Sequence, residues 1–146
     1  MKKVIAMWGG KDIGKSSNIL ALAKEMIRVY PGHRVIHCSM PIASLSIDFR
    51  LILEINNKTF AFESMGDPNS GLNKRLPEII RLYNPDVLIC ACRSKGYTVT
   101  DVENAAANMG AEIIWTTPYQ CAIDQMILND LKAKHLLDLM VNLGLI

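Results

Sequence analysis

Apolar and polar residues follow two different periods along this chain, and each change of period marks the border of an expected element. Short, mainly apolar runs are typical of strands in a sheet, and four occur, at residues 2–8, 34–40, 87–92 and 112–116. Longer stretches, in which apolar residues recur at helical spacing, favour helices at residues 15–30, 72–83, 101–109 and 124–143. Strands therefore alternate with helices along most of the chain.

Residues 46–55 show a different pattern, because apolar and polar side chains alternate there with a period of two. This alternation predicts a strand with one buried face and one face in water. Asn56 and Asn57 supply turn residues, and residues 58–64 form a further strand-like run. The two runs predict a hairpin, so the sheet is expected to contain one antiparallel strand near an edge.

Two local signals refine the helix boundaries. Pro77 fits best in the first turn of a helix, so the second helix is expected to start later than its apolar pattern. Thr100 is expected to cap the alanine-rich helix that starts at Asp101, and Gly110 to end it.

The alternation of strands and helices predicts an α/β fold of three layers, in which a mostly parallel sheet with one antiparallel hairpin strand lies between helices. At 146 residues the chain is expected to form a single domain, residues 1–146. Ligands of such folds bind beyond the carboxyl ends of the parallel strands. The loops that follow the strands are therefore where functional residues are expected.

A glycine-rich segment between the first expected strand and the first expected helix carries the clearest chemical signal. It reads Gly9-x-x-x-x-Gly14-Lys15-Ser16 and matches the Walker A pattern at every specified position. Glycine lets the backbone curl so that successive N–H groups surround a phosphate chain, and the free amides of the following helix point the same way. Lys15 is expected to reach the β- and γ-phosphates and to act in catalysis, and Ser16 to offer its hydroxyl to Mg²⁺.

We call residues 9–16 the glycine loop. The residues expected to bind the nucleotide there are Gly9, Gly10, Lys11, Asp12, Ile13, Gly14, Lys15, Ser16 and Ser17.

This segment resembles the P-loop containing nucleoside triphosphate hydrolase superfamily, specifically over about the first 25 residues of the chain. The resemblance implies a P-loop NTPase-like fold and binding of ATP with Mg²⁺, with hydrolysis of ATP or transfer of its γ-phosphoryl group to an acceptor. Two branches stay open, the ParA/MinD-like ATPases and the small P-loop kinases. Two alternatives to an ATPase or kinase also stay open: a nucleotide-dependent switch or partner-binding module with slow turnover, and a degenerate P-loop protein without catalysis. The ParA/MinD-like proteins carry an extra lysine just after the first glycine, whereas here Gly10 holds that place and Lys11 comes one residue later.

A Mg²⁺–nucleotide site usually needs an acid at the end of a strand that neighbours the strand before the glycine loop. Glu63 is the first candidate, since it follows an apolar run, and Asp67 is its rival. Glu63-Ser64-Met65-Gly66 also resembles the D-x-x-G segment of GTPases, with Glu in place of Asp, which implies that the Gly66 N–H meets the γ-phosphate. The alternative is a strand end and a turn that bind no ligand.

Two further loops hold candidates. Arg93 and Lys95 follow the strand at residues 87–92, where either would neutralise the charge of a moving phosphoryl group; the alternative is a solvated basic loop. Pro118 and Tyr119 follow the last strand, the place where many P-loop relatives bind the nucleobase. The chain contains no N-K-x-D sequence, which favours ATP over GTP.

Composition sets broader limits. Charge is balanced, with 16 basic and 14 acidic residues, so no basic patch indicates nucleic acid. No signal peptide and no membrane span are expected, and a cytoplasmic protein is predicted. The cysteines are interpreted as small core residues in a reducing compartment, with Cys90 and Cys92 on one side of a strand.

The partners expected from this pattern are a nucleotide and either a small molecule or a protein. The final helix carries apolar residues on more than one face, including Ile127, Leu131 and Val141. A homodimer contact through this helix and burial within the monomer both stay open.

Overall fold

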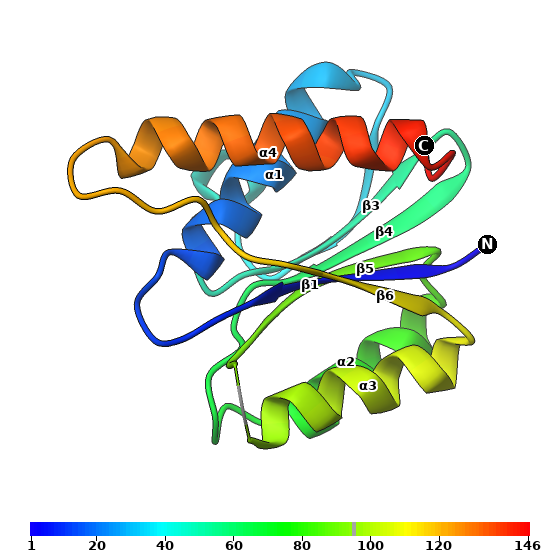
Figure 1. The fold of residues 1–146 in the computed structure, drawn as a ribbon. Helices are drawn as coiled ribbons and strands as arrows, with labels where there is room; N and C mark the ends of the chain where they lie inside the picture. Colours follow the sequence, from blue (N-terminus) through cyan, green and yellow to red (C-terminus); the bar gives the residue numbers. More distant parts are fainter. Residues whose placement is uncertain (95) are drawn as a thin grey trace.

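The computed structural model describes residues 1–94 and 96–146 and shows a six-stranded sheet with helices on both faces (Figure 1). Its strands are β1 (Lys3–Trp8), β2 (Arg34–Cys38), β3 (Arg50–Ile55), β4 (Lys58–Glu63), β5 (Val87–Cys92) and β6 (Glu112–Thr116). The α-helices of the described residues are α1 (Lys15–Val29), α2 (Leu72–Tyr83), α3 (Tyr97–Met109) and α4 (Gln125–Asn142), and a short 3₁₀ helix, η1, spans Ile42–Ser44.

The strands lie in the order β2-β3-β4-β5-β1-β6, and the sheet is mostly parallel. β4, β5, β1 and β6 pair in parallel, while β3 pairs antiparallel with both β2 and β4. Asn56 and Asn57 join β3 to β4 with φ angles of 52° and 64°, the left-handed conformation of a tight hairpin turn. The expected mixed α/β class and antiparallel hairpin strand are therefore confirmed.

The two faces of the sheet are buried by different helices. α1 and α4 cover one face, and α2 and α3 cover the other (Figure 1). Alternate residues of β1 serve the two sides, since Ile5 and Met7 pack under α1 and α4 whereas Val4 and Ala6 pack under α2 and α3. A strand buried on both faces needs apolar residues at successive positions, which explains the uninterrupted apolar sequence of β1 from Val4 to Trp8.

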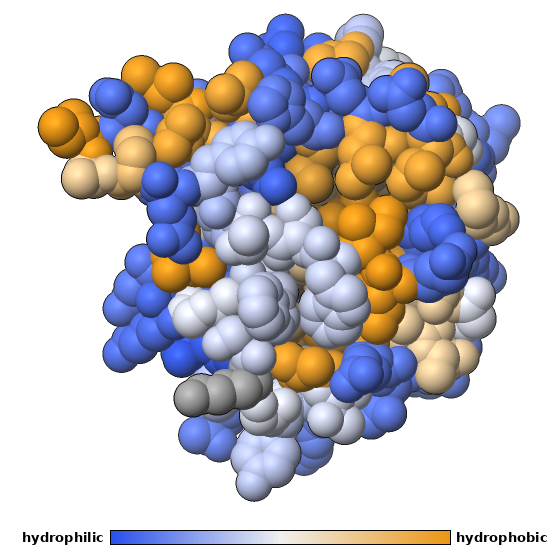
Figure 2. Space-filling view, in the orientation of Figure 1, coloured by the Kyte–Doolittle hydropathy of each residue, from blue (hydrophilic) through white to orange (hydrophobic). Residues whose placement is uncertain are grey.

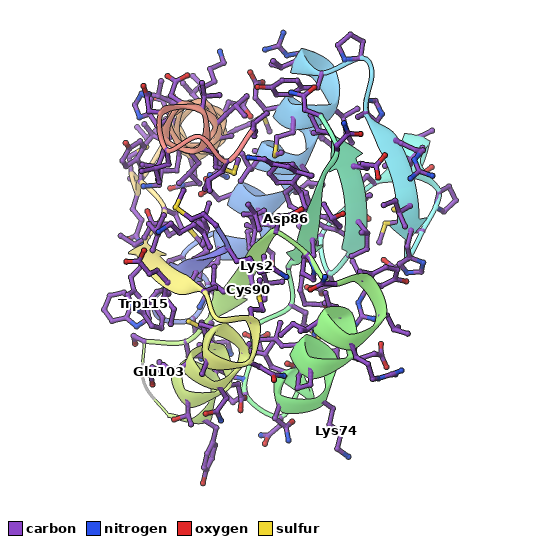
Figure 3. All side chains as sticks on the ribbon, turned by 90° about the vertical axis from the view of Figure 1, so that its right-hand side faces the viewer. Lys2, Lys74, Asp86, Cys90, Glu103 and Trp115 are labelled. Carbon is purple, nitrogen blue, oxygen red and sulfur yellow. The ribbon has the colours of Figure 1, made fainter. Side chains whose placement is uncertain are left out.

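The amino-terminal ends of the central strands are fastened together by Asp86, which directly precedes β5 (Figure 3). Its side chain accepts a hydrogen bond from the Thr59 N–H at 2.8 Å, and its backbone N–H donates to the Thr59 carbonyl at 2.9 Å. Its own carbonyl accepts from the Lys3 N–H at 3.1 Å. These bonds align β4, β5 and β1, so their carboxyl ends finish close together at the opposite edge.

Several expected boundaries were wrong. α2 already begins at Leu72, after Gly71 in a left-handed conformation, so Pro77 lies inside the helix and not in its first turn. α3 begins at Tyr97 after Gly96, three residues before the expected cap at Thr100. In both cases a glycine with positive φ turns the chain into the helix, which hydrophobic spacing does not reveal.

α4 changes character along its length. Its carboxyl-terminal half packs Leu136, Leu137 and Met140 into the core. Around its start, Ile123, Met126 and Ile127 are 90%, 79% and 65% exposed, and hydrophobic side chains gather on this projecting part of the surface (Figure 2). We call these three residues the α4 apolar patch. Across the described residues, no helix combines the length and the apolar character that crossing a bilayer would need.

The cysteines were predicted only in part. Cys90 and Cys92 lie on the same face of β5, as expected, and are buried under α2 and α3; Cys90 is labelled in Figure 3. Cys38 is half-buried. The interpretation as a core residue was wrong for Cys121, which is exposed in the loop before α4.

Candidate functional site

The glycine loop connects β1 to α1 at the carboxyl edge of the sheet. Gly14 caps α1 with a φ of 87°, a left-handed conformation that L-residues rarely adopt. Gly9 has a φ of 152°, which L-residues rarely adopt, and an added Cβ there would lie 2.2 Å from Cδ1 of Ile13, so the end of that side chain would have to move. The first amides of α1 therefore point out of the helix end with no intrahelical acceptor, which favours an anion there.

The Lys15 side chain folds back onto the first residues of the glycine loop. Its ammonium donates to the carbonyl oxygens of Gly9 at 2.6 Å and Gly10 at 2.9 Å, and the residue is 8% exposed. Burial lowers the pKa of Lys15 from its ordinary value, and the positive charge of Arg93 lowers it further. A bound anion beside Lys15 would supply the opposite charge that this buried ammonium lacks.

Ser16 joins the first turn of α1 to the residue after β4. Its hydroxyl donates to the Ser64 carbonyl at 2.7 Å. The hydroxyl proton is thereby directed away, and the oxygen lone pairs remain free to bind a cation. Ser64 is itself fixed, because its Oγ accepts the Phe49 N–H at 2.8 Å.

A hollow of about 370 Å³, which we call the loop pocket, opens over these groups. Its lining residues come from four segments of the chain: Asp12, Ile13, Gly14, Lys15, Ser16, Ser17, Ile47, Asp48, Ser64, Gly66, Asp67 and Ala91. The expected residues Asp12–Ser17, Gly66 and Asp67 are therefore brought together. Gly9, Gly10 and Lys11 belong to the same loop but do not line the pocket.

Asp48 was missed by the sequence analysis. The alternating pattern placed it on the wet face of a strand, but β3 starts only at Arg50, and Asp48 lies in the preceding loop with a φ of 62°. The Ser64–Phe49 hydrogen bond holds this loop against the pocket. A residue in the left-handed conformation cannot take part in the hydrogen bonds of a strand. Asp adopts this conformation more readily than most residues, so Asp48 was the sequence signal that the strand begins after it.

Glu63 does not reach the loop pocket. β5 lies between β4 and β1, so Glu63 ends a strand that does not neighbour the strand before the glycine loop. Its side chain turns to the α2 side, where its Oε2 accepts from Arg50 Nε at 2.9 Å and its Oε1 lies 2.6 Å from Arg75 Nη1. With both carboxylate oxygens on arginines and the residue 4% exposed, Glu63 is placed as part of a buried ion-pair group.

Arg75 connects this ion-pair group to the wall of the loop pocket. Its guanidinium donates to the carbonyl oxygens of Met65 at 2.8 Å and Ser70 at 3.0 Å. These bonds tie α2 to both ends of the loop that contains Gly66 and Asp67. Glu63 thus does not line the pocket, but it orients Arg75, whose hydrogen bonds fix the loop that contains Gly66 and Asp67.

Gly66 and Asp67 form the wall opposite α1. An added Cβ at Gly66 would lie 2.0 Å from the Ala91 carbonyl oxygen, so only glycine lets this loop lie against the end of β5. The Asp67 carboxylate accepts from Arg93 Nη2 at 3.0 Å and Nε at 3.2 Å. Arg93 is therefore held next to Asp67, near enough to Lys15 for its charge to lower the Lys15 pKa, although Arg93 itself does not line the loop pocket. The other predicted basic residue, Lys95, lies outside the described residues.

The predicted nucleobase residues lie apart from the pockets. Pro118 is buried, and the Tyr119 ring packs on α4, with its hydroxyl 2.7 Å from His135 Nδ1 and Lys132 Nζ 4.7 Å from its centroid. A separate hollow of about 280 Å³ adjoins the glycine loop on this side and is lined by Asp12, Ile13, Gly14, Gln120, Cys121 and Gln125. Gln125 shapes it, because its amide bonds the Tyr119 carbonyl at 2.7 Å and the Cys121 N–H at 3.1 Å.

The residues of the loop pocket fit a magnesium ion that is held mainly by phosphate oxygens. The described residues contain no group of three His, Cys, Asp or Glu side chains arranged for a metal. Mg²⁺ bound to nucleotides commonly needs only one or two carboxylates, a hydroxyl and water. Ser16 offers the hydroxyl, and Asp48 and Asp67 line the same hollow as carboxylates.

Comparisons with known proteins do not extend this description: no family model matches the chain, and neither the curated proteins nor the solved structures give a significant match.

Proposed function

We propose that this protein binds Mg-ATP at the glycine loop and transfers the γ-phosphoryl group to water or to an acceptor. The supporting observation is the loop pocket itself, in which a buried lysine, a serine hydroxyl and a helix amino terminus meet opposite a carboxylate. A polyphosphate with its metal needs this combination of groups. The resemblance of the glycine loop to the P-loop superfamily supports the same proposal.

Each group has a distinct part in the proposed reaction. The amides of the glycine loop and α1 hold the phosphates, and Lys15 turns from the loop carbonyls to the β- and γ-phosphate oxygens. Ser16, with Asp48 or Asp67, holds the metal, which neutralises charge on the phosphates when bound. Arg93, beside Lys15, stabilises the charge of the moving phosphoryl group. Positioning and charge suffice here, because phosphoryl transfer needs little covalent help from the protein.

The nucleobase is proposed to occupy the hollow beside Gln120 and Cys121. This hollow shares Asp12, Ile13 and Gly14 with the loop pocket, so one ligand can extend across the loop from one to the other. The adenine preference still rests on the missing N-K-x-D sequence.

The test is thermal melting of the wild type and of Lys15→Ala, with and without Mg-ATP and Mg-GTP. A ligand at about 100 times its Kd stabilises the native state by about 2.7 kcal/mol, a shift of about 5–10 °C for a domain of this size. We expect the shift with Mg-ATP and its loss in Lys15→Ala. Lys24→Ala is the matched control, because Lys24 is an exposed lysine on the same helix outside the loop pocket. The absence of any shift in the wild type would reject the proposal.

A second candidate function is a nucleotide-dependent switch that docks a partner and turns over slowly. The α4 apolar patch favours it, because the patch lies at the same end of α4 as Gln125, which borders the glycine loop. A switch would change from monomer to dimer when a non-hydrolysable ATP analogue and Mg²⁺ are added. Sedimentation velocity with and without the analogue measures this change, and an unchanged monomer would leave the enzyme as the better proposal.

A further inference from the structure

A second hollow lies on the far side of the Asp67 loop from the glycine loop. It has a volume of about 270 Å³ and sits where the starts of α2 and α3 approach each other. Its lining residues are Asp67, Pro68, Asn69, Gly71, Leu72, Asn73, Tyr97, Thr98 and Asp101. We call it the α2–α3 pocket. The function proposed above does not use it.

Asp67 is the residue that the loop pocket and the α2–α3 pocket share. Arg93 stands at the same boundary. Its side chain bonds Asp67 Oδ1, its backbone N–H donates to Thr98 Oγ1 at 2.9 Å, and its charge lowers the pKa of Lys15 in the loop pocket. The two pockets therefore adjoin at Asp67, which lines both.

The wall between the two pockets is fixed. Arg75 bonds the carbonyls of Met65 and Ser70, and the Ser70 hydroxyl donates to the Asp67 carbonyl at 2.5 Å. Thr98 is 2% exposed and holds the other side through Arg93. Rigid walls set the distance between two reactants before either binds, which is the geometric requirement for direct transfer.

The lining of the α2–α3 pocket selects for a small molecule rich in hydrogen-bond donors. Asp67 and Asp101 contribute carboxylates, which accept only, and Asn69 and Asn73 contribute amide oxygens. Burial raises the pKa of Asp101, because the charged carboxylate is partly withdrawn from water. Hydroxyl groups match such a lining. The volume is below the range of about 300–1,000 Å³ typical for drug-sized ligands, so the occupant is small.

We propose that the α2–α3 pocket binds the phosphoryl acceptor, a small polyhydroxylated molecule, and this inference rests on the proposed binding of Mg-ATP at the glycine loop. In the reaction, a hydroxyl oxygen of the acceptor forms a bond to the γ-phosphorus. The bond from the γ-phosphorus to the β–γ bridging oxygen breaks, and its electron pair leaves with ADP. The hydroxyl proton passes to the Asp67 carboxylate, which borders both pockets, and then to water, while Ser16 and Asp48 would hold the metal.

The experiment uses ATP labelled in its γ-phosphate and a panel of hydroxyl compounds: glycerol, glucose, ribose, myo-inositol and adenosine. Labelled phosphate esters are separated from inorganic phosphate by chromatography, for the wild type, Asp101→Asn and Glu103→Gln. Asp101 lines the α2–α3 pocket, whereas Glu103 lies exposed on the same helix outside that pocket, so it is the matched control (Figure 3). Mg-ATP melting shifts are measured on the same three proteins.

We expect a labelled ester with at least one compound of the panel. Asp101→Asn should lower its formation at least about tenfold, chiefly by raising the acceptor KM, because a donating amide N–H₂ replaces one hydrogen-bond acceptor of the pocket. Its Mg-ATP melting shift should remain, and Glu103→Gln should behave as the wild type. A Mg-ATP shift with label only in inorganic phosphate, or an Asp101→Asn enzyme that transfers like the wild type, would overturn this inference alone. No Mg-ATP shift would reject the function on which it rests.

Discussion

Replacing Glu63 by Gln separates a structural role of this carboxylate from the metal-binding role that the sequence suggested. The substitution keeps the volume and one oxygen but removes the charge. In the native protein that charge lies between Arg50 and Arg75, whose side chains are 15% and 21% exposed. The Glu63 side chain is 6% exposed, so water does little to screen the loss.

The expected cost follows from this burial. Removing one partner of a buried ion pair typically costs about 3–5 kcal/mol, because the remaining charge is left uncompensated. Glu78 still pairs with Arg50 at 2.5 Å, and Arg75 keeps its bonds to backbone carbonyls. The loss should therefore lie near the lower limit, at about 3 kcal/mol, or about 6–12 °C in melting temperature for a domain of this size.

The assay is thermal melting without ligand, followed by titration of the variant with Mg-ATP well below its melting temperature. Glu78→Gln is the matched control, because it takes a carboxylate from the same arginine at an exposed position. Exposed ion pairs contribute little, so this control should melt close to the wild type. Glu63→Gln should then melt much lower than either protein, yet still bind Mg-ATP at low temperature.

One result would refute the reasoning. If Glu63→Gln melted like the wild type but lost its Mg²⁺-dependent nucleotide binding, Glu63 would be a metal ligand. The ion-pair group with Arg50 and Arg75 would then contribute nothing measurable to the fold.

Three further changes test other parts of the structure. Gly66→Ala should lower stability by about 1–3 kcal/mol and weaken Mg-ATP binding, since its Cβ would lie 2.0 Å from the Ala91 carbonyl oxygen. Thermal melting measures the stability and titration measures the binding, and undiminished binding would contradict the described contact. Pro77→Ala should raise the free energy of unfolding in urea by about 1–2 kcal/mol, because it restores a backbone N–H that can donate within α2. A loss of stability would show instead that the proline is favourable there. At pH 8 a thiol reagent should label exposed Cys121 quickly and Cys92 hardly at all, since burial raises the Cys92 pKa to about 11 and its thiolate forms only at much higher pH. Mg-ATP should slow labelling of Cys121, as mass spectrometry would show, and unchanged labelling would place the nucleobase elsewhere.

The fold was largely predictable because its central strands are short apolar runs that are buried on both faces. β1 is apolar from Val4 to Trp8 and β5 is apolar throughout, a pattern typical of parallel strands in the middle of a sheet. Helix starts were less predictable. Gly71 and Gly96 begin α2 and α3 through their backbone conformation alone, and neither requires a particular spacing of apolar residues.

The glycine loop was predictable because its pattern is local, and Lys15 is fixed by the carbonyls of Gly9 and Gly10, which are nearby in the sequence. The acid opposite it was not. Whether Glu63 or Asp67 faces the loop depends on strand order, and sequence cannot show that β5 inserts between β4 and β1. It also cannot show that two arginines enclose Glu63, since Arg50 and Arg75 come from separate elements.

The position of β1 between β5 and β6 has a consequence for biosynthesis. β1 is made before both of its neighbours, since Lys3 pairs with Val87 on one side and Glu112 on the other, both far along the chain. The segment from β2 to β4, in contrast, pairs locally as each strand emerges from the ribosome. The glycine loop therefore cannot be held in place until most of the chain has been translated, because β1 lacks both neighbours until then. A nascent chain that stops before β6 should leave β1 without one of its two neighbours, so the glycine loop should become ordered only after β6 has been made.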